Sequence, residues 1–272
     1  MHTRLTREEA VLLITVSFVV TAAWSGMLYD WSMFFRPAAE AVFHRVSPYS
    51  VSGFYSPPWV ALGFVPLALL PNIIAHAILP LMAVAAWIAV ARHLGATPFA
   101  MALLLVSPPV FISIYNGQLE WLVFMSLLLP ARWGLLLVAV KPQVGLGIAV
   151  WFIAEAWREG RWRQVRKLLG PVSVALGASV ALFGWWMFNA MELTNSTQNV
   201  SVWPFGVPVG LALLAQSVRR RDIRWALPAG PLVSIYSQLY SWNGLVLTGV
   251  HSRRTMVTIV SLFWVVVIIR AW

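Results

Sequence analysis

The sequence AVLLITVSFVVTAAWSGMLY, residues 10–29, is a run of 20 residues without a charged side chain. At about 1.5 Å per residue, a helix of this length crosses the roughly 30 Å hydrocarbon core of a bilayer. A short polar segment with Arg4, Arg7, Glu8 and Glu9 precedes the run. A secretory signal peptide has a shorter apolar core followed by a cleavage site, so we expect an uncleaved membrane anchor whose N-terminus lies inside.

The composition of the whole chain agrees with this anchor. Of the 272 residues, 60% are apolar and only 10% are charged, and the mean hydropathy is +0.78. A soluble protein of this size needs far more charged side chains to cover its surface, whereas lipid tails accept apolar side chains. The sequence therefore predicts an all-α integral membrane protein. The absence of cysteine excludes disulfides, thiolate metal sites and thiol nucleophiles.

The net charge of +10 raises the question of a nucleic-acid partner. The cationic residues lie between apolar segments, most densely in residues 158–167 and 219–224. This placement is typical of cytoplasmic loops that face anionic lipid headgroups, so we expect contacts with membrane lipid and none with nucleic acid. The same placement of the cationic residues predicts that the segment from Asp30 to Pro58 lies on the outer side of the membrane.

Further apolar segments follow the first helix and predict a single transmembrane domain over residues 1–272. With the first helix they give about eight to ten spans. Several are shorter than the roughly 17 residues that a crossing needs and contain proline, which predicts broken or half-depth helices around a cavity. The segments are Trp59–Leu70, Ile73–Ala91, Phe99–Ile114, Leu119–Leu129, Trp133–Ala156, Pro171–Phe188, Trp203–Val218, Ala226–Leu247 and Met256–Ile269.

The first outer loop, residues 30–58, is predicted to contain an interfacial helix. Arg36, Glu40 and His44 recur at every fourth position, and apolar residues occupy much of the remaining surface. Asp30 lies where the first helix leaves the bilayer. Partial loss of water there would raise its pKa towards that of a useful general base, although an aspartate at this position also serves as a helix N-cap.

Polar residues inside the apolar segments mark a second candidate region. Lys141 is one of only two lysines and is followed by Pro142 and Gln143. A proline there breaks the helix beside the ammonium group, and an ionisable group at this depth faces either a cavity or a charged partner. Glu120 is the candidate partner, in which case the pair is structural. No spacing of His, Asp or Glu resembles a metal site, and we expect no cofactor.

Three further features of the sequence are weaker signals. His76 is a lone histidine on an apolar helix, which favours a local hydrogen bond. Asn195 and Asn199 each begin a match to the N-glycosylation acceptor pattern Asn-X-Ser/Thr, which has meaning only where the source glycosylates proteins. Residues 236–243, with Tyr236, Tyr240 and Asn243, interrupt the penultimate apolar segment, and a broken helix can present side chains to a ligand.

The order of these motifs resembles the GT-C class of membrane glycosyltransferases, in a shortened form of the family 87 type that includes polyprenyl-phosphate-mannose-dependent mannosyltransferases. The motifs that carry the resemblance span about residues 30–247. They are DWSMFFRPAAEAV (30–42), SPY (47–49), FYSPP (54–58), SPP (107–109), NGQ (116–118), KPQ (141–143) and YSWN (240–243).

The resemblance implies that Asp30 is the catalytic base of an inverting transfer on the non-cytoplasmic face. The donor would be a polyprenyl-phosphate sugar, mannose-like or a pentose, and the acceptor a glycan or glycolipid. Lys141 is the first candidate for the departing phosphate and Arg36 the second. We expect the substrate-binding residues to be Arg36, Tyr55, Gln118, Lys141, Gln143, Tyr240 and Asn243.

Two other functions remain open. A non-catalytic subunit of a larger membrane complex would use its basic loops to hold lipid and its tryptophans to pack against protein partners. A transporter would also use broken helices, but no inverted repeat is visible. The expected location is the cytoplasmic membrane of a prokaryote. Convergence of Asp30, Gln118 and Lys141 beside a groove favours the transferase, whereas an Asp30 cap and a packed Lys141–Glu120 pair favour the subunit.

Overall fold

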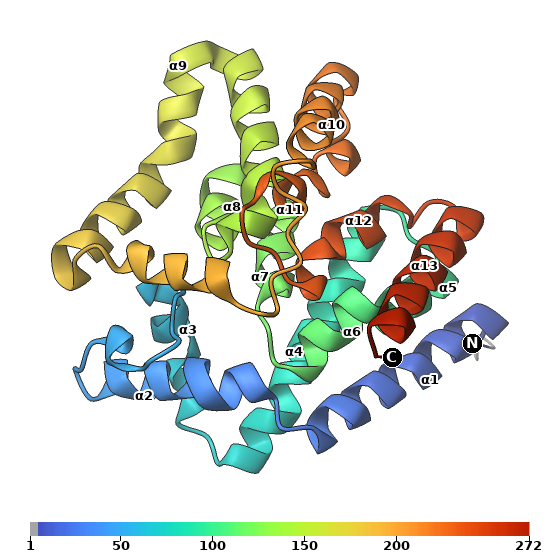
Figure 1. Ribbon diagram of the computed structural model, residues 1–272, viewed down its shortest axis with the longest axis horizontal. Coiled ribbons are helices and arrows are strands. Elements are labelled where there is room, and N and C mark those ends of the chain that lie inside the picture. Colours follow the sequence, from blue (N-terminus) through green and yellow to red (C-terminus); the bar gives the residue numbers. More distant parts are fainter. Residues whose placement is uncertain (1–4, 272) are drawn as a thin grey trace, which may run out of the picture.

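The computed structural model describes residues 5–271, which are helical over most of their length and contain no strand (Figure 1). The α-helices are α1 (Arg7–Ser25), α2 (Arg36–Phe43), α3 (Pro58–Ala68), α4 (Asn72–His93), α5 (Pro98–Val106), α6 (Pro108–Tyr115), α7 (Glu120–Met125), α8 (Ala131–Val138), α9 (Pro142–Phe183), α10 (Val207–Arg220), α11 (Ala229–Val233), α12 (Asn243–Thr248) and α13 (Arg253–Ala271). A π-helix, η1 (Trp31–Phe35), and five 3₁₀ segments connect them: η2 (Pro48–Ser50), η3 (Ser126–Leu128), η4 (Trp186–Asn195), η5 (Ile223–Trp225) and η6 (Leu239–Trp242).

Three of the described helices, α1, α4 and α9, are long and apolar enough to cross a membrane. The pair formed by α5 and α6, which bends by 64°, would make a fourth. Many large apolar side chains on these helices face outward, including Ile14 on α1, Ile73 on α4 and Leu182 on α9. Lipid is the solvent that such a surface favours. The long apolar helices thus indicate membrane association, as the composition predicts, and the number of crossings remains a prediction.

Prolines set where several of the helices begin. Pro58, Pro98, Pro108 and Pro142 each occupy the first turn of a helix, where a missing N–H costs no hydrogen bond. The residue before a proline is biased away from helical geometry, so the preceding helix ends there. The predicted segment Trp133–Ala156 is accordingly divided into α8 and the start of α9.

The segment between α1 and α3 contains the predicted helix. The π-helix η1 continues directly into α2, so that the chain is helical from Trp31 to Phe43. Its buried face includes Trp31, Phe35, Ala38 and Ala39, while Arg36 and Glu40 form an ion pair of 2.8 Å on the opposite side. Trp31 packs edge-to-face on Phe64 of α3, which fixes the start of this helix against the body of the molecule.

Helix α9 is two helices joined at a break. Gly160 and Arg161 have non-helical backbone angles, and the chain turns sharply there (Figure 1). The first arm carries Lys141 at its N-terminal end, and the second arm leads to η4. The predicted basic loop, residues 158–167, is therefore the apex of α9.

Close backbone packing fixes the first arm of α9 against the segment around α11. A Cβ atom on Gly147 would lie 1.9 Å from the carbonyl oxygen of Ala226, and one on Gly230 would lie 2.6 Å from that of Gln143. Only glycine permits an approach this close. As a result, the chain that continues through Tyr236 and Tyr240 runs beside the start of α9.

Candidate functional site

Asp30 lies at the junction between α1 and η1. Its backbone N–H donates to the carbonyl oxygen of Asn116 over 2.9 Å, which ties the junction to the turn after α6. Asp30 is the residue that precedes η1, but its side chain makes no capping hydrogen bond there. The Asp30 side chain therefore does not act as a helix cap.

The turn at residues 116–118 is shaped by Gly117. Its φ of +72° lies in the left-handed region, and a Cβ atom there would come within 3.0 Å of Cβ of Trp31. Glycine both adopts this conformation and allows the approach. The turn thereby directs the buried side chain of Gln118 towards Asp30, 88 residues earlier in the chain.

Gln118 connects the two candidate residues. Its Nε2 donates to Oδ2 of Asp30 and, over 3.0 Å, to the hydroxyl oxygen of Tyr240, while its Oε1 accepts from Nζ of Lys141. The carboxylate lies on the amide nitrogen side and the ammonium on the carbonyl side, so each end of the amide faces the charge it prefers. One amide thus separates the carboxylate of Asp30 from the ammonium of Lys141.

Lys141 also forms the predicted pair with Glu120. Its Nζ donates to Oε1 of Glu120 over 2.5 Å, and the other carboxylate oxygen of this fully buried glutamate accepts from Oγ of Ser113 over 2.8 Å. The Lys141 ammonium lies 4.8 Å from the centroid of the Tyr240 ring, in cation–π geometry. We refer to Asp30, Ser113, Gln118, Glu120, Lys141 and Tyr240 as the polar network.

The polar network contains two carboxylates and one ammonium. Burial raises the pKa of Asp30 to about 6, although the charge of Lys141 and the hydrogen bond from Gln118 both act to lower it. An acid with a pKa near 6 is ionised at neutral pH and still able to hold a proton that it accepts. Within residues 5–271, no hydrogen bond engages Oδ1 of Asp30, so this oxygen can accept one from a bound molecule.

The segment carrying Tyr236 and Tyr240 is held in place by Asn199. The Asn199 amide donates to the carbonyl oxygens of Thr194 and Ile235 and accepts from the backbone N–H groups of Ser201 and Ser237, over 3.0 to 3.2 Å. These four bonds use the full capacity of the side chain. The sequence marks Asn199 only as a match to the N-glycosylation acceptor pattern. In the fold, its side chain joins the segment around residues 194–201 to the segment at residues 235–237.

The remaining predicted site residues lie outside the network. Arg36 bonds to Glu40, to Asn72 and to the carbonyl oxygen of Leu70. The hydroxyl group of Tyr55 donates to Glu192 over 3.2 Å. Gln143 lies in the first turn of α9 and has no bond to the network, and the buried Asn243 amide has no hydrogen-bond partner in the described chain.

The local hydrogen bond predicted for His76 is confirmed, since its Nδ1 lies 3.0 Å from the carbonyl oxygen of Asn72. Asp222, the other aspartate of the chain, pairs with Arg224. Ser113 is the network member that the sequence did not reveal. A serine in an apolar helix is common, and only the folded chain shows that it faces Glu120.

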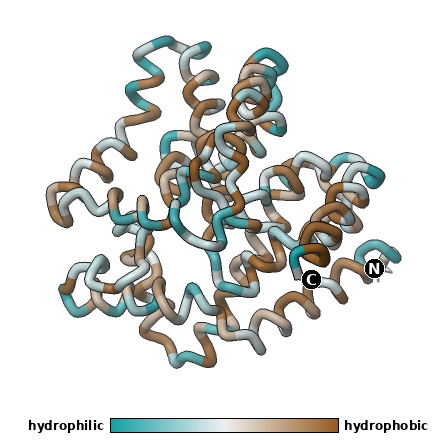
Figure 2. Tube along the Cα trace, in the orientation of Figure 1, coloured by the Kyte–Doolittle hydropathy of each residue, from teal (hydrophilic) through white to brown (hydrophobic). Residues whose placement is uncertain are grey.

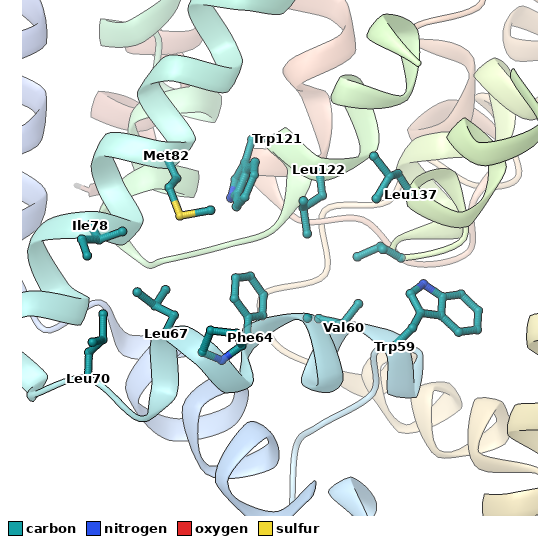
Figure 3. A pocket seen from close by; sticks show the side chains of 13 residues that line it. Trp59, Val60, Phe64, Leu67, Leu70, Ile78, Met82, Trp121, Leu122 and Leu137 are labelled. Atoms are coloured by element: carbon teal, nitrogen blue, oxygen red, sulfur yellow. The ribbon is translucent and has the colours of Figure 1, made fainter. Parts of the chain in front are cut away.

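An apolar pocket of about 440 Å³ lies between α3 and the helices α4, α7 and α8 (Figure 3). Trp59 and Phe64 of α3 line one side, with Met82 of α4 and Trp121 and Leu137 of α7 and α8 opposite them. Trp121 directly follows Glu120 in the chain, and Val140, also in the lining, directly precedes Lys141. The pocket and the polar network are therefore linked through neighbouring residues at two points of the chain.

Comparison of the chain with models of known protein families, with curated proteins and with solved structures finds no match. What the polar network does must therefore be inferred from its own geometry and from the motifs that compose it.

Proposed function

We propose that the protein is an inverting glycosyltransferase that uses a polyprenyl-phosphate sugar as its donor. The observation that carries the proposal is the Gln118 amide, which holds the Asp30 carboxylate and the Lys141 ammonium on its two ends. A transfer of this kind needs a base for the incoming hydroxyl group and a cation for the outgoing phosphate, close together. The order of motifs that resembles family 87 of the GT-C class supports the same function.

In the proposed reaction, the acceptor hydroxyl oxygen attacks the anomeric carbon of the sugar. The bond between that carbon and the phosphate oxygen breaks, its electron pair leaves with the polyprenyl phosphate, and the hydroxyl proton passes to Asp30. Oδ1 of Asp30 is the oxygen available for this proton. A single displacement needs one carboxylate and inverts the anomeric configuration, unlike a double displacement, which needs a second carboxylate as nucleophile.

Lys141 would stabilise the charge on the departing phosphate. Its ammonium has three N–H groups, of which one donates to Gln118 and one to Glu120. The apolar pocket beside Val140 and Trp121 would hold the first part of the prenyl chain. Arg36, the second candidate for the phosphate, is bound to Glu40 and Asn72 and has no part in the proposal.

The proposal is tested by transfer from polyprenyl-phosphate sugars, mannose-like and pentose, in membranes that contain the full chain. We expect Asp30→Asn to abolish transfer while the protein remains folded. The matched control is Asp222→Asn, because Asp222 is the only other aspartate and pairs with Arg224 far along the chain. Equal transfer by wild type and Asp30→Asn would remove Asp30 from the mechanism.

The role of Lys141 is tested in a charge-balanced background. Lys141→Met alone leaves Glu120 as a buried charge without a cation, so the variant to compare is Lys141→Met with Glu120→Gln. We expect its apparent affinity for the donor to fall at least tenfold while the affinity for the acceptor stays within about twofold. An unchanged donor affinity would contradict the phosphate role.

The alternative of a non-catalytic subunit is favoured by one observation. Lys141 and Glu120 form a close pair in packed protein, as a purely structural ion pair would. That function predicts that Asp30→Asn has no effect on any transfer reaction and that the chain purifies with other membrane proteins. Measuring transfer by Asp30→Asn and Asp222→Asn thus distinguishes the two functions.

A further inference from the structure

The apex of α9 and the C-terminal end of α10 form one strongly basic surface, which we call the basic end. It comprises residues 155–167 and 219–224, which contain nine arginine and lysine side chains and three carboxylates. Both elements extend to the top of Figure 1, and Figure 2 shows hydrophilic residues at the same two places. The two segments are joined by Arg158, whose guanidinium donates to the carbonyl oxygen of Val218.

Most of the cations at the basic end have no carboxylate partner within the described chain. The ion pairs found there are Arg158 with Glu155 and Arg224 with Asp222. The side chains left without such a pair are all exposed: Arg161, Arg163, Arg166, Lys167, Arg219, Arg220 and Arg221. Like charges gathered at one surface repel one another, which favours an anionic partner.

Tryptophans border the cations. Trp162 is 65% exposed at the apex and packs edge-to-face with Trp157 at 5.1 Å. Arg161 lies over the Trp157 ring at 5.4 Å, and Arg220 lies over the Trp225 ring at 5.2 Å. Exposed tryptophan beside arginine is typical of the membrane–water interface, where the ring contacts the acyl boundary and the cation contacts phosphate.

We propose that the basic end binds the phosphate groups of anionic phospholipids in the adjacent leaflet. An acidic protein would satisfy the charges but would not account for the exposed Trp162 at the end of a lipid-facing helix. Each arginine close to an anionic membrane surface raises the affinity of the protein for that surface about fivefold. The loss of three of them would weaken binding about 100-fold. The proposal is independent of the glycosyltransferase function.

The test uses the full-length protein in neutral detergent with equal amounts of phosphatidylglycerol and phosphatidylcholine, and the retained lipid is counted by native mass spectrometry. We expect wild type to retain phosphatidylglycerol preferentially. The triple variant Arg161→Gln, Arg163→Gln and Arg219→Gln should lose this preference. A control triple, Arg45→Gln, Arg132→Gln and Arg270→Gln, removes the same charge from exposed arginines elsewhere and should keep it.

Three results would overturn the proposal. The first is equal retention of phosphatidylglycerol by wild type and the basic-end triple. The second is its displacement by sodium phosphate at the same concentration, which would indicate a site for free phosphate. The third is tighter binding of a polyglutamate peptide than of phosphatidylglycerol, which would indicate an acidic protein partner.

Discussion

Hydrogen bonds to one another or to the side chains of Gln118 and Ser113 hold the charges of Asp30, Glu120 and Lys141, whereas the cations of the basic end face outward with few carboxylates near them. Both regions carry charge in a chain that is largely apolar. In the first, the polar network, each charge has lost much of its water and depends on hydrogen bonds from distant parts of the chain. In the second, water and salt screen each charge.

This difference predicts where single substitutions matter. Removing one partner from a buried set leaves another charge without compensation, which costs several kcal/mol. Removing one exposed arginine leaves its neighbours solvated and changes folding little. The polar network should therefore respond to single changes in stability, and the basic end should respond only in its binding of anionic partners.

The largest effect is expected for Lys141→Met. The substitution leaves the buried Glu120 and the half-buried Asp30 without their cation, so the free energy of unfolding should fall by about 3–5 kcal/mol. Denaturation in mixed detergent measures the change. Adding Glu120→Gln should recover more than half of the loss, because it removes the uncompensated carboxylate. If the double variant is no more stable than the single one, the pair does not govern stability.

A smaller effect is expected for Gly117→Ala. Alanine would have to adopt a φ of +72° and place its Cβ 3.0 Å from that of Trp31, at a cost of about 1–3 kcal/mol in the free energy of unfolding. Gly170→Ala is the matched control, since a Cβ there meets no atom within 4 Å and lies in a helix. The control should be neutral or stabilising. Equal losses in both variants would show that the turn tolerates a side chain.

Asp30 predicts a pH dependence of stability. Its pKa is raised to about 6 by burial, so the folded protein binds a proton that the unfolded chain releases near pH 4. The contribution to stability is thus present below about pH 4 and is lost as the pH rises through about 6, by about 1–2 kcal/mol. Thermal unfolding of wild type and Asp30→Asn between pH 4 and 7 isolates this contribution. A constant difference between the two proteins would contradict it.

Sequence alone predicts which groups of the polar network are unusual and that Lys141 pairs with Glu120, but not the bonds that Gln118 makes. Lys141 and Glu120 stand out because a charge in an apolar segment needs a partner, and Pro142 predicts the helix break beside them. The bonds of Gln118 to Asp30 and Tyr240 cross 88 and 122 residues. No local pattern encodes such distances, because they depend on how α1, the 116–118 turn and η6 pack.

The contacts of the basic end are likewise not predictable from the sequence, although its charges are. The basic segments at 158–167 and 219–224 are visible as runs of charge, and their placement on one side follows from the alternation of apolar segments. The contact of Arg158 with Val218 depends on how the first arm of α9 packs beside α10, and no local pattern of the sequence encodes that packing. The motif likewise makes Arg36 the second candidate for the phosphate, and its hydrogen bond to Asn72 follows only from the folded chain.

The smallest effect on stability is expected for the basic-end triple, Arg161→Gln, Arg163→Gln and Arg219→Gln. These side chains are exposed and have no carboxylate partner in the described chain, so no desolvated charge is left behind and the Tm in neutral detergent should not change measurably. With phosphatidylglycerol added, the Tm of wild type should rise and that of the triple should not, because only the folded protein holds the cations close together. Lys141→Met, in contrast, should lower the Tm both with and without phosphatidylglycerol. A large loss of Tm in the triple without lipid would mean that the apex of α9 stabilises the fold itself, and the two charged regions would then differ less than their burial implies.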